Sequence, residues 1–238
     1  MVFTFWEGKM PDYLKLCMKT WKFPYIVLTY DNLHEYTDLQ ITDRLTSYTL
    51  PQIADVVRVH VLRDNGGYWL DTDTIMLSDE LPTENMVGYV KERTNTIGYL
   101  HTEKNSQMFK MWAKYQDDIL KLPYTHTHWG IMGNLFTDSY VLSHPEITIY
   151  PVDNCWAETY MVGRQEELVY HAISRFDKYR LFYFGSMFSQ YHLSDLRPTK
   201  MLMLHNSWTP DVYKNISEKQ ILEDDRHTLS NILREVLK

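Results

Sequence analysis

The sequence predicts a single α/β domain, because strand-like and helix-like segments alternate from the first residues onward. Residues 2–6 and 25–30 are short runs of β-branched and aromatic residues, and residues 12–22 between them carry apolar side chains at helical spacing. The chain has 238 residues, of which 44% are hydrophobic and 23% charged. Such a composition can bury one sizeable core, so we expect a β-α-β unit at the N-terminus.

The next elements lead to a glycine pair. Residues 25–30 are apolar without interruption, which is typical of a strand buried on both faces of a parallel sheet. A helical face then runs from Leu50 to Leu62, and residues 63–67 form a stop signal whose two glycines can take positive φ. The strand Tyr68–Leu70 follows directly. Its extended pattern continues through Asp71-Thr72-Asp73 as far as Leu77.

The later elements are placed by periodicity and turn signals. We expect a loop-rich stretch at residues 123–134, strands near residues 86–90, 147–150 and 200–204, and helices over residues 106–120 and 217–238.

The charge and the cysteines exclude several classes of protein. A formal charge of −7 and a pI near 5.8 argue against a nucleic-acid surface, which needs an excess of Lys and Arg. Cys17 and Cys155 are too few for a disulfide framework, so a reducing compartment fits best. The start has no signal-peptide pattern, and no segment approaches about 18 apolar residues. We expect a cytoplasmic protein without a transmembrane segment, and peripheral docking at the inner face of the cell membrane stays open.

The segment Asp71-Thr72-Asp73 carries the clearest chemistry. In an extended strand, side chains two residues apart project to the same side, so the two carboxylates would converge. A hard divalent cation such as Mn²⁺ or Mg²⁺ takes oxygen ligands of this kind and keeps positions open for diphosphate oxygens. Asp55 and Arg58, on the helix before, share one helix face at spacing i, i+3. The alternative for that pair is an ordinary exposed ion pair.

The block from Ala54 to Arg58, followed by Gly66 to Asp73, resembles the signature of the DXD glycosyltransferases of family 32, which are similar to capsular polysaccharide synthesis glycosyltransferases. The resemblance implies a GT-A-like domain with a mixed, mostly parallel sheet flanked by helices. It also implies that Asp55 and Arg58 contact the donor, and that Asp71 and Asp73 hold the sugar and the metal.

The ends of the chain extend the resemblance. Residues 5–11 look like the first strand of that family, whose tryptophan, Trp6 here, stacks on the nucleotide base; the alternative is a core tryptophan. His205-Asn206-Ser207-Trp208 is similar to the family's closing element. His205 would then be a metal ligand or a hydrogen-bonded loop histidine, and Ser207 and Trp208 would bind phosphate or anchor the loop.

His126, His128 and Trp129 have the composition of an acceptor site, because an indole face packs on a sugar ring and imidazoles bond its hydroxyls. The alternative is an ordinary surface loop. In a single domain of residues 1–238, we therefore expect a donor-binding half in residues 1–91, a helical and loop-rich acceptor-side subdomain in residues 92–200, and a closing loop and helix in residues 201–238.

The reaction implied is transfer of a hexose from a nucleotide sugar, typically a UDP-sugar, to a saccharide or lipid-linked saccharide in capsule or surface-polysaccharide synthesis. The resemblance implies retention of the anomeric configuration. Two other classes stay open on the sequence: a metal-dependent phosphohydrolase, and a carbohydrate-binding protein without catalytic activity.

Overall fold

The structure is a computed structural model that describes residues 1–123, 128–161, 173–185 and 191–238. The chain forms two compact units whose segments interleave along the sequence. Unit 1 comprises residues 1–8, 23–71 and 82–151, and unit 2 comprises residues 9–22, 72–81 and 152–238. Each unit contains its own sheet, so the two are described separately below.

Unit 1 contains a six-stranded mixed sheet in the order β2-β1-β3-β6-β5-β7. The pairs β1–β2, β1–β3 and β5–β7 are parallel, whereas β6 is antiparallel to both of its neighbours, β3 and β5. The predicted α/β class and the mixed, mostly parallel sheet are therefore confirmed. The strands are β1 (Val2–Phe5), β2 (Tyr25–Leu28), β3 (Gly67–Leu70), β5 (Met86–Tyr89), β6 (Thr94–Thr102) and β7 (Ile149–Pro151).

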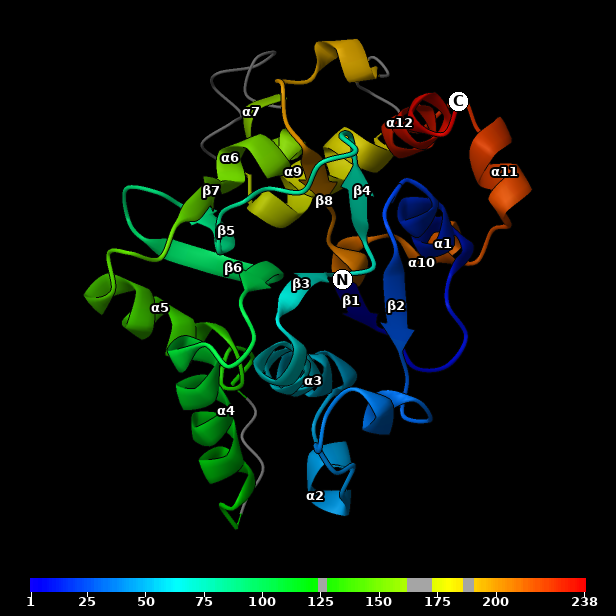
Figure 1. Ribbon diagram of the computed structural model, residues 1–238. Coiled ribbons are helices and arrows are strands. Elements are labelled where there is room, and N and C mark those ends of the chain that lie inside the picture. The colour runs from blue at the N-terminus through cyan, green and yellow to red at the C-terminus, as the bar shows by residue number, and fades with distance from the viewer. Residues whose placement is uncertain (124–127, 162–172, 186–190) are drawn as a thin grey trace. The chain divides into compact units, whose positions relative to one another are not determined.

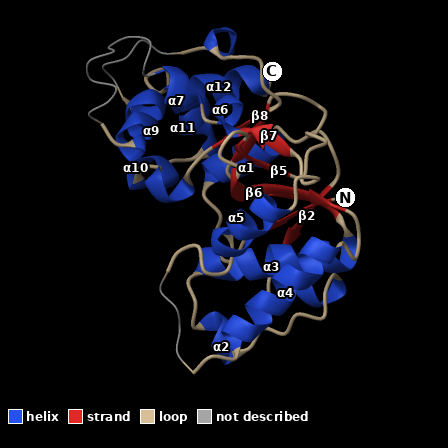
Figure 2. Cartoon of the chain, turned by 90° about the vertical axis from the view of Figure 1, so that its left-hand side faces the viewer, coloured by secondary structure: helices blue, strands red, loops and turns tan. Residues whose placement is uncertain are grey.

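The helices of unit 1 pack on this sheet and on each other, as both general views show (Figures 1 and 2). Helix α3 contacts β1 and β3, α4 packs against α3, and α5 lies along β6. The core between them is apolar and includes Val56, Trp69 and Trp112. The helical elements are η1 (Leu33–Glu35), α2 (Asp43–Thr46), α3 (Leu50–Asn65), α4 (Gln107–Leu120) and α5 (Asn134–Ser143).

Helix α3 is bounded by sequence signals at both ends. The Gln52 side chain accepts a hydrogen bond from the Thr49 amide, and Pro51 lies in the first turn. The helix runs to Asn65, three residues beyond the predicted end, and stops where Gly66 takes φ +68° and Gly67 φ +91°. A Cβ would lie 2.4 Å from the Lys104 backbone nitrogen at Gly66 and 2.4 Å from the Met1 carbonyl oxygen at Gly67. Both positions therefore require glycine.

Unit 2 is mainly helical and surrounds a two-stranded antiparallel sheet of β4 (Thr74–Met76) and β8 (Met201–Met203). Helices α1 and α6 pack on these strands, and α9 contacts α7 and α12 (Figure 1). Cys17 and Cys155 are buried here as free thiols. The helical elements are α1 (Asp12–Lys19), α6 (Val152–Cys155), α7 (Ala157–Met161), α9 (Arg175–Phe184), η3 (Leu193–Asp195), η4 (Asn206–Trp208), α10 (Asp211–Lys214), α11 (Glu218–Glu223) and α12 (Thr228–Val236).

Three sequence predictions of local structure are wrong. Strand β2 lies at the edge of its sheet and is fully buried only at Leu28, so it is not covered on both faces. The C-terminal segment forms α11 and α12 rather than one helix, because the Asp224 carboxylate accepts a hydrogen bond from the Arg226 amide and stabilises a turn. The extended pattern of residues 68–77 is interrupted by a turn at residues 72–73, between β3 and β4.

Candidate functional site

Asp71 lies directly after β3, where its amide still donates to the Gly98 carbonyl oxygen of β6 at 2.9 Å. Its carboxylate is held through one oxygen, Oδ1, which accepts from the Trp69 indole nitrogen at 2.8 Å and lies 3.2 Å from Arg58 Nη2. The side chain is 37% exposed. In the described part of the chain, no residue hydrogen-bonds to the other oxygen, Oδ2. Asp71 thus presents an oriented carboxylate oxygen to a ligand.

Arg58 is the buried centre of this group. Its Nη2 lies 3.0 Å from Asp55 Oδ1 as well as near Asp71, its Nη1 donates to the Ile97 carbonyl oxygen, and its Nε donates to the Ala54 carbonyl oxygen at 3.3 Å. The guanidinium carbon lies 5.0 Å from the centroid of the Trp69 ring. Asp55 and Arg58 do share a helix face, but with Arg58 4% exposed they are not an exposed ion pair. Because its N–H groups are largely committed, Arg58 positions the two carboxylates.

Asp55 is buried enough for its protonation to change. The pKa of Asp55 is raised to about 7, mainly by burial; the positive charge of Arg58 opposes this shift and the charge of Asp71 contributes to it. Near neutral pH the carboxyl is therefore present in both forms and can accept or donate a hydrogen bond. A Cβ at position 133 would lie 2.3 Å from Ile97 Cδ1 and 3.2 Å from Asp55 Oδ2, so the Gly133 backbone packs closely against Asp55 where a side chain would not fit.

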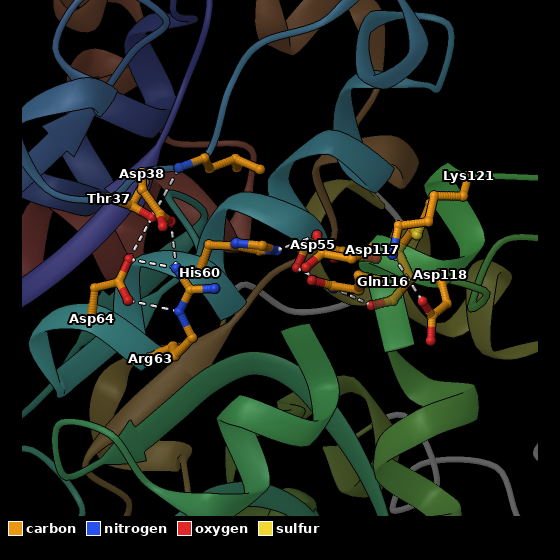
Figure 3. A network of polar contacts seen from close by, with 12 residues as sticks. Thr37, Asp38, Asp55, His60, Arg63, Asp64, Gln116, Asp117, Asp118 and Lys121 are labelled. Atoms are coloured by element: carbon orange, nitrogen blue, oxygen red, sulfur yellow. Dashed lines mark hydrogen bonds and ion pairs between the residues drawn. The ribbon is translucent and has the colours of Figure 1, made fainter. Parts of the chain in front are cut away.

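Gln116 connects Met132 to Asp55, and Figure 3 shows Gln116 beside Asp55. Its side-chain amide donates to the Asp55 carbonyl oxygen at 2.9 Å and to the Met132 carbonyl oxygen at 2.6 Å. The His128 carbonyl oxygen accepts a further bond from the Gln52 side chain at 3.2 Å. Residues 128–132 are therefore held against helices α3 and α4, and among them Trp129 is 63% exposed.

In unit 2, Asp73 is bound from two directions by the segment that follows β8. Its carbonyl oxygen accepts from the Leu204 amide at 3.0 Å, and its Oδ2 accepts from the Asn206 amide at 2.7 Å. The Asn206 side chain accepts in turn from the Tyr13 hydroxyl. The late His205–Trp208 element therefore does return to the second aspartate of the motif.

His205 is surrounded by aromatic rings and by a cation. Its ring packs against Trp156, Tyr179 and Trp208, and its Nε2 lies 2.5 Å from Arg175 Nη2. Burial lowers the pKa of His205 to about 3, and the positive charge of Arg175 adds to that effect. His205 is thus a neutral acceptor for the guanidinium.

Behind Arg175 lies Glu158, which is fully buried. Its Oε1 is 3.7 Å from Arg175 Nε and 3.8 Å from His205 Nε2, and neither carboxylate oxygen has a hydrogen-bond partner within the described residues. Burial raises the pKa of Glu158 to about 7, and the guanidinium of Arg175 opposes that shift. Buried, incompletely satisfied carboxylates concentrate at functional sites.

Comparison with known proteins shows the family of the chain. The family described as "Capsular polysaccharide synthesis protein" matches residues 1–200. The chain belongs to this family. No curated protein matches the chain. A solved structure of PaToxG glycosyltransferase is similar to it at 13% sequence identity, with a TM-score of 0.43, over 60% of this chain and 68% of that one.

Membership confirms the capsular polysaccharide part of the predicted resemblance, and the assignment to family 32 stays a prediction. Within the described residues, no helix is both long and apolar enough to cross a membrane.

Other predicted site residues vary in their surroundings. Trp6 is half-buried, and its indole N–H is buried without a partner among the described residues. Ser207 is exposed, whereas Trp208 is half-buried and packs on Phe176, Tyr179 and His205. His128 is exposed, and His126 lies outside the described residues.

The predicted metal ligands fit a divalent cation unequally. Asp71 and Asp73 supply the carboxylate oxygens that Mn²⁺ and Mg²⁺ prefer. His205 does not fit, because Arg175 already occupies Nε2 and places a positive charge beside it. Among the described residues, no group of three His, Cys, Asp or Glu side chains is arranged to hold a metal ion.

Sequence reasoning missed Arg175 and Glu158 as site residues. They lie in the long stretch without a recognised motif, 30 and 47 residues before His205. Their only signal in the sequence is an arginine and a glutamate near Trp156, which is too common a combination to single out.

Proposed function

We propose that this protein is a metal-dependent glycosyltransferase that moves a hexose from a nucleotide sugar, a UDP-sugar, to a saccharide acceptor in capsular polysaccharide synthesis. The observation that carries the proposal is the contact of the buried Arg58 guanidinium with both Asp55 and Asp71 beside the end of β3, in a chain of a capsular polysaccharide synthesis family. Ligands of open α/β sheets bind at this end of the strands.

Each residue has a role in this proposal. Asp71 and Asp73 would hold Mn²⁺ or Mg²⁺, which would supply positive charge for the departing diphosphate. Asp55, with Oδ2 beside Gly133, accepts hydrogen bonds from hydroxyls of the donor sugar. Arg58 fixes Asp55 and Asp71. Trp6 stacks on the base, and Ser207 and Trp208 contact phosphate.

Trp129 carries the acceptor part of the proposal. Its ring is exposed on a loop that Gln116 anchors next to Asp55. An exposed indole on a fixed loop is suited to packing on a sugar ring, because the stacking surface loses little entropy when the sugar binds. His128 lies beside it and supplies a hydrogen-bonding group.

The direct test is to incubate the protein with Mn²⁺ and a panel of sugar nucleotides, and to measure nucleotide release with and without saccharide acceptors. Release that requires an acceptor supports the transferase. Release of phosphate without any acceptor indicates a phosphohydrolase, and binding without turnover across the panel indicates a carbohydrate-binding protein. NMR of the product tests retention of configuration.

Two variants sharpen this test. Asp71→Asn should lower acceptor-dependent release at least about 100-fold, because a metal and charge-stabilising group is lost at the leaving diphosphate. Asp79→Asn removes a carboxylate of the same charge eight residues later, where it is 71% exposed and pairs with Lys22. That variant should keep full activity. Equal activity in both variants would refute the proposed role of Asp71.

A further inference from the structure

In unit 2, one short segment contacts both a cation and the second aspartate of the motif. The Asn206 amide binds Asp73 Oδ2, and His205, one residue earlier, accepts from Arg175. Arg175 is therefore linked to Asp73 through two adjacent residues of one short segment. The protein as a whole carries a charge of −7, so an anionic ligand near Asp73 requires local positive charge.

Arg175 is held in a way that suits recognition of an anion. Its guanidinium carbon lies 3.2 Å from the centroid of the Trp156 ring and 5.3 Å from that of Trp208. Stacking uses the faces of a guanidinium and directs its N–H donors outward in the plane, where they match phosphate geometry. The side chain is nevertheless 33% exposed, so a ligand can reach it.

Glu158 fixes Arg175 without fully neutralising it. The carboxylate lies 3.7 Å from Arg175 Nε, beyond the distance of a charge-assisted hydrogen bond. It is buried on the protein side, whereas Arg175 is partly exposed. A buried counter-ion at that distance orients the guanidinium, whose partly exposed side chain a ligand can still reach.

We propose that Arg175 binds the diphosphate of the nucleotide-sugar donor, and that Glu158 and Trp156 position its guanidinium. The inference rests on the proposed transferase function and adds to it a residue from outside the recognised motifs. When the bond between C1 and the diphosphate oxygen breaks, its electron pair stays on that oxygen. The acceptor oxygen forms the new bond to C1, and its proton passes to the departing phosphate. An N–H donor from Arg175 stabilises the charge on the phosphate oxygens.

The test compares binding of UDP and of uridine in the presence of Mn²⁺ by isothermal titration calorimetry, because uridine lacks the diphosphate. Arg175→Met should weaken UDP binding about tenfold or more, the usual effect of losing a charge-assisted hydrogen bond. Uridine binding should change less than about twofold, because Arg175 is proposed to contact the diphosphate and not the base. In turnover assays, the same variant should lower kcat/KM for the donor.

Arg197→Met is the matched control. Arg197 also lies in unit 2 and also stacks on an aromatic ring, with its guanidinium carbon 4.3 Å from the Tyr160 centroid. The control changes the charge by the same amount and should leave UDP binding unchanged. Should Arg175→Met fail to fold, as judged by circular dichroism, Arg175→Lys keeps the charge but loses the planar fork. It should still bind UDP several-fold more weakly than the wild type.

The outcomes separate this inference from the proposed function. Wild-type protein that binds no nucleoside diphosphate, tested with UDP, GDP, CDP, ADP and dTDP, contradicts both. Wild-type protein that binds UDP, together with an Arg175 variant that binds it equally well, overturns the role of Arg175 alone. Equal weakening of UDP and uridine binding also overturns it, because the effect would then be structural.

Discussion

Replacing Asp55 by Asn should stabilise the protein at alkaline pH while it removes a donor-binding group. The carboxylate is 12% exposed, and burial raises its pKa from 3.8 to about 7 even with Arg58 beside it. Ionisation of Asp55 therefore lowers the stability of the folded protein. Asparagine has the same shape and carries no charge, so it relieves the cost of burying one.

The size and sign of this stability difference follow from the linkage between proton binding and folding. Because the pKa is raised in the folded state, the native protein binds this proton more tightly than the unfolded chain does. The stabilising contribution of protonated Asp55 is fully present below pH 3.8 and is lost as the pH rises to about 7. At about 1.4 kcal/mol per pH unit, the full loss is about 4 kcal/mol. Between pH 5 and pH 8, the variant should gain about 3 kcal/mol over the wild type.

Urea unfolding at several pH values, with EDTA present to remove divalent cations, measures this difference. Arg58 keeps Asp71 as a partner at 3.2 Å in the variant, so its own charge stays paired. Asp79→Asn serves as the control and should change stability by less than about 0.5 kcal/mol at every pH. A difference between Asp55→Asn and wild type that is constant from pH 5 to pH 8, or a variant that is less stable at pH 8, would refute the reasoning.

Three further substitutions test other parts of the structure. Gly66→Ala should lower the free energy of unfolding in urea by about 2 kcal/mol or more, because its Cβ would lie 2.4 Å from the Lys104 backbone nitrogen. Gly8→Ala is the control: Gly8 has φ +79° but nothing within 4 Å of its Cβ position, so the loss should be only about 1 kcal/mol. Trp129→Ala should raise KM for the acceptor about tenfold, the effect of one lost stacking contact, with donor KM and the melting temperature unchanged. Gln116→Leu removes two buried hydrogen bonds, to the Asp55 and Met132 carbonyl oxygens, and should cost about 2 kcal/mol, measured in the same way.

Local signals along the chain predicted the elements that have strong boundaries. The glycine pair after α3 and the apolar run of β1 were both readable, because each depends on neighbouring residues alone. The central strand β6 was missed. Its sequence, TNTIGYLHT, lacks an alternating apolar pattern, and its place between β3 and β5 is set by pairing with strands distant in sequence.

The candidate site divides in the same way. Asp55, Arg58 and Asp71 were predicted from a compact motif, and they do come together around one guanidinium. Arg175 and Glu158 meet His205 from other parts of the chain, and such contacts arise only from the packing of α7, α9 and η4. The motif likewise could not reveal that Arg175 excludes His205 Nε2 from a metal.

Because of the turn at residues 72–73, the two motif aspartates are not oriented toward a ligand by strand geometry. The strand argument required an extended backbone that carries both carboxylates to one side, and that backbone is absent from this part of the structure. Instead each carboxylate is oriented by donors of its own unit: Asp71 by Trp69 and Arg58, and Asp73 by the Asn206 amide. The spacing Asp-x-Asp is then a property of the connection between β3 and β4. A functional motif of this kind should therefore be distinguished from a chance one by its donors, here an indole two residues before the first aspartate and an amide contributed late in the chain.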